Sequence, residues 1–407
     1  MRRTMDVVTA ETPRNVKHAS VMLTKVVRKE KMMVKNTKCL FSDGVSTEGM
    51  VSVSQMQTFM SCPKKWAYNY IENLSARVER PYLSIGKLCH KGMEAAMRYK
   101  WEHSVDGENT LDFNEGEMLE AALLAMQEEW DEYMNSNCFL QEELPVQEQI
   151  LTDATQVFKQ AFGEFDFEKY EVLTLYKDGK AVPALELHFL MPCPGSKGLH
   201  GYIDAILRDK TTGYIWCTDY KFRKSLSPDE DEAFNIQNAV YTRACAKMGI
   251  PITGTMTWQH VNTPAADPAQ LKNGAFSRAK IKTTWEHYAE VVAAAGGNPD
   301  DYEEEMKPKL ADIEWFRPTL EYRNPETVQR IWEQSIVPAS WAIKRAYKAN
   351  NPRFVYPWNC KMCQYGDLCQ AELRGHDADF LRSTEYTKRT TKGAGNPSGD
   401  ATVAPAT

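Results

Sequence analysis

LHGYIDAILRD (residues 199–209), GYIWCTDYKF (213–222) and AFNIQNAVY (233–241) predict two strands followed by a helix. Side chains alternate between the two faces of a strand, so Asp219 and Lys221 should lie side by side on one face of the second strand. The same rule places Asp204 of the first strand on a face with His200, Tyr202 and Ile206, opposite Ile203, Ala205 and Leu207.

The predicted helix carries two further polar side chains at matched spacing. Gln237 and Tyr241 are four residues apart and therefore share a helix face. Two acids, a lysine and a Gln/Tyr pair within about forty residues indicate a metal-assisted hydrolytic site.

Composition is ordinary for a soluble globular protein: 43% hydrophobic and 26% charged among 407 residues. No apolar run approaches the roughly 20 residues of a membrane span, and no secretory signal is visible. The net charge of −6 neither indicates nor excludes a polyanionic partner. Ten unevenly spaced cysteines favour a reduced compartment, so we expect a cytoplasmic protein.

The chain divides into three parts by composition. Residues 1–49 form a basic extension, expected to be a poorly ordered leader, with a nucleic-acid-binding arm or a targeting peptide as alternatives. Residues 50–382 form one domain, and residues 383–407 are expected to be a disordered tail. In the domain we expect Ser54 to cap the first helix.

A basic stretch follows the last predicted core strand. Lys272, Arg278, Lys280 and Lys282 lie near Phe276 and Trp285. Such a stretch could follow a phosphate backbone, although charged segments are more often simply solvated.

Three cysteines crowd near the C-terminus in the pattern C-x2-C-x5-C: Cys360, Cys363 and Cys369. A closed zinc site or an iron–sulfur cluster normally needs four ligands, so a distant fourth is expected. Cys62, in its own turn before Pro63, is the best candidate. The spacing does not distinguish zinc from iron–sulfur.

Together these pieces resemble the PD-(D/E)XK nuclease superfamily, in the RecB-like branch with an iron–sulfur cluster. This branch includes CRISPR-associated RecB-like exonucleases, the AddB nuclease domain and phage exonucleases. The matching motifs occur in the family's order: Ser52, Ser54, Phe59, Cys62 and Pro63; Gly86 and His90; Gly201 and Asp204; Asp219 and Lys221; Gln237 and Tyr241; and the terminal cysteines.

The resemblance implies an α/β fold, with a central mixed β-sheet flanked by helices in a restriction-endonuclease-like core. It also implies N- and C-terminal helical regions joined by a metal cluster. By the same resemblance, His90, Asp204, Asp219 and the backbone carbonyl of Tyr220 bind Mg²⁺ or Mn²⁺. Lys221 would orient the attacking water or stabilise the transition state. Gln237 and Tyr241 would position the water, the lysine or a phosphate, and Glu186 would be an outer acid. Cys62, Cys360, Cys363 and Cys369 would hold a [4Fe–4S] cluster.

The function implied is a metal-dependent DNA exonuclease acting on single-stranded ends, in recombination, repair or phage DNA processing. The sequence contains no G-x4-GK[ST] loop, so unwinding would require a helicase or recombination partner. The alternatives are a non-catalytic iron–sulfur subunit that binds DNA or assembles a nuclease complex, and a zinc-stapled structural protein.

Overall fold

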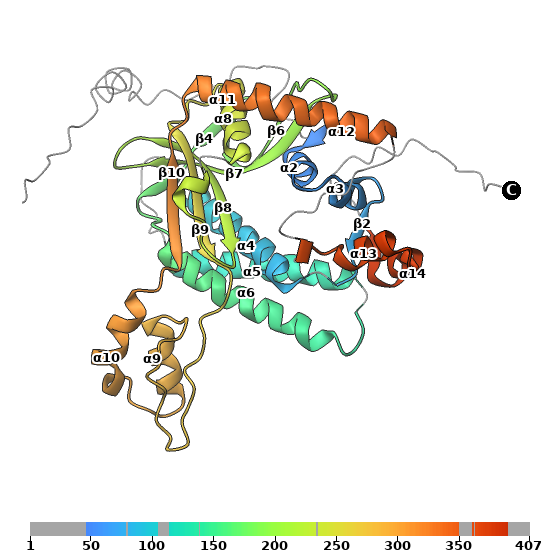
Figure 1. The fold of residues 1–407 in the computed structure, drawn as a ribbon. Helices are drawn as coiled ribbons and strands as arrows, with labels where there is room; N and C mark the ends of the chain where they lie inside the picture. The colour runs from blue at the N-terminus through green and yellow to red at the C-terminus, as the bar shows by residue number, and fades with distance from the viewer. Residues whose placement is uncertain are drawn as a thin grey trace, which may run out of the picture.

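The computed structural model describes residues 46–389, except residues 79, 105–113, 138, 233–234, 350–359 and 362. The basic extension falls almost entirely outside these residues, and so does the chain from residue 390 onward. Figure 1 shows a twisted sheet with helices on both sides and a small helical appendage below it.

A seven-stranded mixed sheet forms the centre of the fold, as predicted. Its main path is β1-β7-β8-β9-β10, and β3 and β6 also pair with β7. The strands are β1 (Val51–Ser52), β3 (Tyr170–Val172), β6 (Leu185–Met191), β7 (Leu199–Asp209), β8 (Ile215–Arg223), β9 (Gly254–Val261) and β10 (Phe316–Glu321). The β1–β7 and β8–β9 pairs are parallel, and the remaining pairs are antiparallel.

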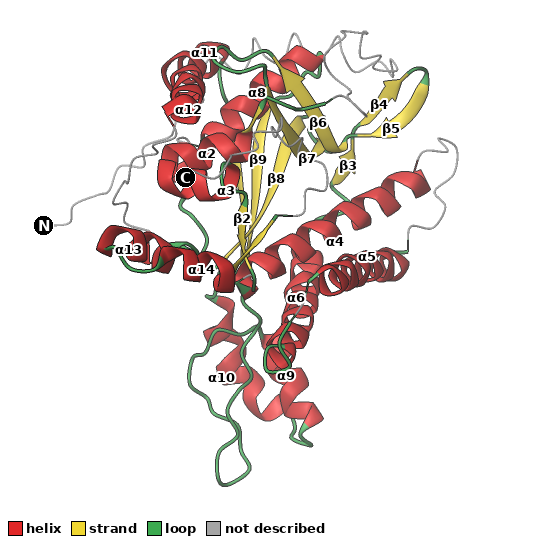
Figure 2. Ribbon diagram, turned by 90° about the vertical axis from the view of Figure 1, so that its right-hand side faces the viewer, coloured by secondary structure: helices red, strands yellow, loops and turns green. Residues whose placement is uncertain are grey.

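One face of the sheet is covered by three long helices: α4 (Pro81–Ser104), α5 (Glu115–Ser136) and α6 (Leu144–Glu164). Their apolar stripes bury residues such as Met93, Met126 and Phe158 against Leu207, Trp216 and Tyr220 of the sheet. Figure 2 shows these helices stacked together beside the strands. Helix α5 is rich in acidic residues and lies in the sequence between His90 and the strands.

The other face is covered by a second set of helices. They are α2 (Val53–Ser61), α8 (Ile236–Met248), α11 (Pro325–Ile331) and α12 (Val337–Ala349), with a π-helical turn, η1 (Trp332–Ile336), between the last two. Their core includes Met56, Val240, Ile336 and Ile343. Helix α8 and the short α7 (Asp229–Glu232) form the crossover between the parallel strands β8 and β9.

Helix α2 begins two residues earlier than predicted. Ser52 is the N-cap: its hydroxyl accepts from the Gln55 amide, and the Gln55 side chain accepts from the Ser52 amide. The expectation that Ser54 caps the helix was wrong, because Ser54 already lies inside this capping box.

The N- and C-terminal helical regions pack together. Helix α3 (Pro63–Tyr70) and β2 (Leu74–Ala76) contact α13 (Gly366–Arg374), α14 (Ala378–Glu385) and β11 (Tyr386–Lys388) through a small core that includes Tyr68, Tyr365 and Tyr386. Strand β11 pairs with β2, so regular structure continues past the boundary expected at residue 382. The β4–β5 hairpin (Thr174–Lys177 and Lys180–Pro183) stands apart from the main sheet.

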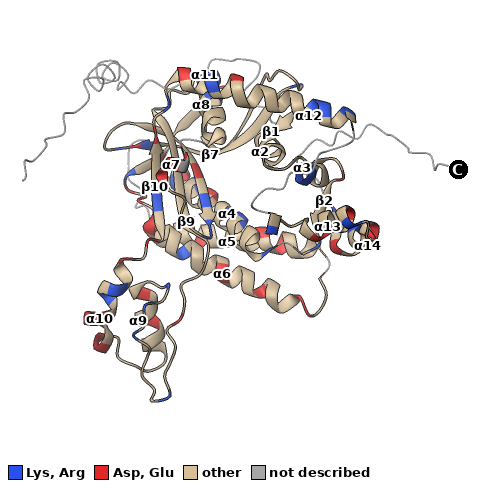
Figure 3. Cartoon of the chain, viewed as in Figure 1, with Lys and Arg blue, Asp and Glu red and all other residues tan. Residues whose placement is uncertain are grey.

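The appendage contains α9 (Trp285–Ala294) and α10 (Asp300–Ala311), packed on a core of their own. Basic and acidic side chains are mixed over it in Figure 3. Arg278 pairs with Glu305 at 2.7 Å, and Lys280 lies 3.6 Å from Asp312. These contacts favour the interpretation that the basic stretch is simply solvated over the interpretation that it follows a phosphate backbone. No helix among the described residues is both long and apolar enough to cross a membrane.

Candidate active site

The candidate site lies where two neighbouring strands of the sheet separate. Along one edge of β7, β8 pairs with residues 205–208 and β1 pairs with residues 199–200. Asp204 falls between these two pairings. Its carboxylate bridges the gap, because Oδ2 accepts a 2.9 Å hydrogen bond from the Tyr220 amide of β8. The Tyr220 amide is therefore bonded to a side-chain carboxylate, whereas in a regular ladder it would be bonded to a backbone carbonyl.

Strand alternation breaks at this point. Ile203 and Ile206 pack in the core beneath α8, whereas Ala205 and Leu207 pack in the core beneath α4. The prediction that Ile203, Ala205 and Leu207 share one face was wrong, because it assumed an unbroken two-residue period. On the neighbouring strand, Glu186 has a φ of 44°, a left-handed conformation unusual for glutamate.

Asp219 and Lys221 lie side by side on β8, as the two-residue period predicts. Lys221 Nζ is 2.7 Å from the Asp219 carboxylate and donates a hydrogen bond to Oδ1. The Asp219 side chain is only 3% exposed, and Lys221 Nζ also lies 2.7 Å from Oδ2. Carboxylate oxygens at a buried site are ligands that divalent cations prefer.

Helix α8 directs Gln237 and Tyr241 to the same carboxylate. Asn235 caps the helix by accepting from the Gln237 amide, which fixes the first turn. Gln237 Nε2 donates to Asp219 Oδ1 at 3.2 Å and to the Tyr241 hydroxyl at 2.7 Å. Lys221 Nζ donates to Gln237 Oε1 at 3.5 Å. The predicted pair thus holds both the acid and the lysine.

His90 comes from α4 on the other side of the gap. Its Nδ1 lies 3.4 Å from Asp204 Oδ2, and its ring packs edge-on against Tyr220 and Phe222. The structure therefore brings together residues more than a hundred positions apart. The Tyr220 ring is buried in the core, whereas the Tyr220 backbone lies at the site, between Asp219 and Lys221 on β8.

Burial and mutual repulsion shape the titration of the acids. Burial, followed by the charge of Asp219, raises the pKa of Asp204 above its ordinary value. Burial, followed by the charge of Asp204, raises the pKa of Glu186 to about 8. Three carboxyl groups gathered in a poorly solvated site repel one another, and a bound cation would relieve that repulsion.

A cavity of about 640 Å³ opens onto these groups. Its walls include His90, Glu186, Asp204 and Lys221, together with Arg223 at the end of β8. Glu186, predicted as an outer acid, therefore reaches the same cavity.

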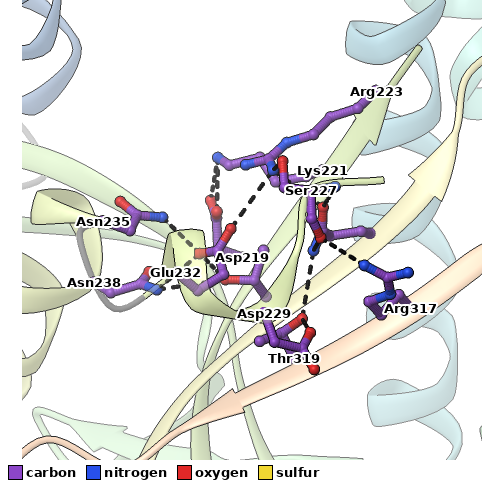
Figure 4. A network of polar contacts seen from close by, with 12 residues as sticks. Asp219, Lys221, Arg223, Ser227, Asp229, Glu232, Asn235, Asn238, Arg317 and Thr319 are labelled. Carbon is purple, nitrogen blue, oxygen red and sulfur yellow. Dashed lines mark hydrogen bonds and ion pairs between the residues drawn. The ribbon is translucent and has the colours of Figure 1, made fainter. Parts of the chain in front are cut away.

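A polar network next to the site was not predicted from the sequence (Figure 4). Glu232 is 2% exposed, and its carboxylate accepts from Asn235, Asn238 and Thr257. Arg223 Nη1 lies 3.5 Å from Glu232 and donates to Gln259 at 3.1 Å. The sequence feature that could have indicated this network is the position of Arg223, two residues after Lys221 on the same strand.

The donors fit a divalent cation in their chemistry, since carboxylate oxygens and an imidazole suit Mg²⁺ or Mn²⁺. The gathering of His90, Asp204 and Asp219 at one strand gap supports the fit, and so does the raised pKa of Asp204 beside Asp219. Among the described residues, no three His, Cys, Asp or Glu side chains are close enough together to hold a metal ion.

The four predicted cluster cysteines are all described and unpaired: Cys62, Cys360, Cys363 and Cys369. Cys62 caps α3, and Cys363 and Cys369 border the small core that joins α3 to α13. Burial and then the neighbouring Cys62 thiol raise the pKa of Cys369 to about 11. Burial, followed by the Cys62 thiol, raises the pKa of both Cys360 and Cys369, so these thiols lie in one region, although no three of the four described thiols are close enough to hold a metal ion.

Comparison with protein-family models gives one match. The model described as "PD-(D/E)XK nuclease superfamily" matches residues 50–370, a range that contains every proposed site residue. Comparison with curated proteins gives no significant match.

Proposed function

The chain belongs to the PD-(D/E)XK nuclease superfamily, and from that premise we propose that it is a divalent-metal-dependent deoxyribonuclease acting on single-stranded ends. The observation that carries this proposal is the contact of Lys221 and Gln237 with the buried Asp219, facing Asp204 across the strand gap. Lys221 lines an open cavity together with the carboxyl groups of Asp204 and Glu186, and acids with perturbed pKa values in a cleft are candidates for a functional site.

We assign the cation to His90, Asp204, Asp219 and the backbone carbonyl of Tyr220, with Mg²⁺ and Mn²⁺ as the candidate ions. When bound, a divalent ion neutralises phosphate charge and acidifies water, which favours phosphodiester hydrolysis. The chain's own groups supply the remaining functions. Lys221 presents an ammonium to the phosphate, where negative charge develops during hydrolysis.

Gln237 and Tyr241 act as positioning residues for Lys221 and Asp219. Gln237 donates to Asp219 Oδ1 and to the Tyr241 hydroxyl, and these hydrogen bonds fix the orientation of the carboxylate. Glu186 retains its proton at neutral pH because its pKa is about 8, so it adds little negative charge to the cavity. We assign it an outer role, as a hydrogen-bond donor rather than a cation ligand.

We propose that Cys62, Cys360, Cys363 and Cys369 hold a [4Fe–4S] cluster with a structural role. The packing of α3 against α13 supports this assignment, since a cluster at that junction would close a loop of about 300 residues. The proposed setting is cytoplasmic DNA recombination, repair or phage DNA processing, with a separate protein unwinding duplex DNA.

Digestion of end-labelled single- and double-stranded DNA tests the proposal, with Mg²⁺, Mn²⁺ or EDTA present. We expect cleavage of single strands from an end, loss of cleavage in EDTA, and a loss of about 100-fold or more in Lys221→Ala. Lys247→Ala, at an exposed position on α8, is the matched control. Equal cleavage by Lys221→Ala and wild type would refute the site.

A further inference from the structure

A second, larger cavity of about 1090 Å³ lies beside the active site. It is bounded by the start of α2, by β7 and by α12, which come from distant parts of the chain. Its walls carry many side-chain hydroxyls and amides, including Ser54, Gln57 and Asn73. We call it the aromatic–basic groove, after Tyr70, Tyr202, Tyr347, Lys197, Lys344, Lys348 and Arg389 in its walls.

The charge of this groove is opposite to that of the whole protein. Four basic residues line it, and the described lining contains no Asp or Glu, although the chain has a net charge of −6. Within the described residues, none of the four is neutralised by an ion pair. Figure 3 shows the basic residues toward the end of α12. Such a concentration of positive charge favours a polyanion.

Aromatic rings accompany these charges. Tyr202 is 45% exposed and stacks on His188, with ring centroids 4.5 Å apart and planes 13° apart. Tyr347 is held by an edge contact with Trp66 and by a hydrogen bond from Gln55 to its hydroxyl. Positive charge combined with preorganised aromatic rings is the pattern used to bind single-stranded nucleic acid, because unpaired bases stack on the rings.

The groove leads to the proposed catalytic groups. Gln237 and Tyr241 line it, and Gln237 also contacts Asp219 and Lys221. Gln57 of α2 donates to Gln237 at 3.4 Å, so the floor of the groove is continuous with the site. Lys221, which lines the active-site cavity, contacts Gln237, which lines the groove.

We propose that the aromatic–basic groove binds the single strand of DNA whose end is cleaved at Asp219 and Lys221. Lys344 and Lys348 contact phosphates, and Tyr202 stacks on a base. This inference rests on the proposed nuclease function for its catalytic consequence, but strand binding in the groove can be measured without cleavage.

Binding of a labelled oligothymidine in EDTA tests the phosphate contacts, with fluorescence anisotropy measured at several salt concentrations. For the K344A/K348A double variant we expect weaker binding and a log Kd against log salt slope smaller by about 1.4, from two lost contacts. The control K307A/K309A removes the same charge from α10, where Lys307 is exposed and Lys309 is half-buried. Identical slopes in the two double variants would overturn the proposal.

Two further variants test stacking. We expect Tyr202→Ala to bind about tenfold more weakly and Tyr202→Phe to bind like wild type, since stacking requires the ring and not the hydroxyl. Equal binding by Tyr202→Ala and wild type would overturn the stacking role. Duplex DNA of equal length competing as well as the single strand would overturn the single-strand assignment.

Hydrolysis of bis(p-nitrophenyl) phosphate separates the two proposals, because this small diester does not extend along the groove. We expect wild type to hydrolyse this diester, and we expect KM for DNA to rise in K344A/K348A but not in K307A/K309A. If wild type cleaves neither substrate, the nuclease proposal fails, and the binding measurements still decide the groove. If wild type cleaves both and K344A/K348A matches K307A/K309A throughout, only the groove proposal fails.

Discussion

Lys221 Nζ lies 2.7 Å from each oxygen of the Asp219 carboxylate and donates a hydrogen bond to Oδ1. The ammonium therefore compensates a negative charge that is buried in the site. This contact links the stability of the site to its proposed chemistry, because removing the lysine leaves a buried charge without its partner.

Lys221→Met is expected to lose DNA cleavage by about 100-fold or more and to melt at a lower temperature in EDTA. Mg²⁺ should then raise the melting temperature more in the variant than in wild type, because the cation replaces the missing ammonium. Melting curves with and without Mg²⁺ check this expectation. A Mg²⁺ response no larger than that of wild type would argue against a cation beside Asp219.

Asp204→Asn should have the opposite effect on stability. Burial and Asp219 raise the pKa of Asp204, so ionisation of this group costs folding free energy at neutral pH. An amide keeps the acceptor for the Tyr220 N–H and removes the charge. We expect a higher melting temperature than wild type in EDTA near pH 7, a smaller Mg²⁺ response, and cleavage reduced to background. A melting temperature below that of wild type would contradict the claim that ionisation of Asp204 costs folding free energy.

The raised pKa of Glu186 predicts that the difference in stability between Glu186→Gln and wild type depends on pH. Its folded pKa of about 8 lies above the ordinary 4.5, so between these values the folded protein holds a proton that the unfolded chain releases. Stability contributed by this proton is lost as pH rises through 8. In EDTA, the melting temperature of Glu186→Gln should exceed that of wild type by a margin that grows from about pH 4.5 to 8 and then levels off.

Glu128→Gln, at an exposed position on α5, provides the comparison for this titration. It should follow the wild-type curve at every pH. A constant margin between Glu186→Gln and wild type across the range would show that the substitution acts through packing rather than through the proton.

Sequence periodicity predicted the parts of the site that depend on local geometry. Asp219 with Lys221, and Gln237 with Tyr241, lie on shared faces because a strand and a helix have fixed repeats. The mixed sheet and His90 required the family resemblance, since no local pattern relates α4 to β7. The structure then supplied the distance between His90 and Asp204.

The features that sequence reasoning missed arise from tertiary contacts. The alternation of β7 breaks at Asp204 because β8 separates from it there, and that separation is not encoded in a two-residue period. Glu232 lies in the run DEDE, which has the composition of a solvated segment. It is buried only because α7 folds over the end of the sheet and meets Thr257 and Arg223.

Glu232→Ala should therefore destabilise the protein by about 3 kcal/mol, because it leaves Arg223 and several buried donors without their acceptor. Glu230→Ala, at an exposed position on the same helix, should change stability by less than about 0.5 kcal/mol. Chemical denaturation measures both values. Similar losses in the two variants would mean that the network around Glu232 contributes little.

Cysteine substitutions test the junction between α3 and α13. Anaerobically prepared wild type should be brown and contain iron and sulfide, whereas Cys62→Ser and Cys363→Ser should lose colour and iron together. Both should melt at a lower temperature, because the ligands come from opposite ends of the domain. Cys193→Ser, at a buried position in another core, should keep the iron even where it costs some stability. A colourless wild-type protein with bound zinc would replace the iron–sulfur assignment with a zinc site, and iron retained in Cys62→Ser would remove Cys62 from the ligand set.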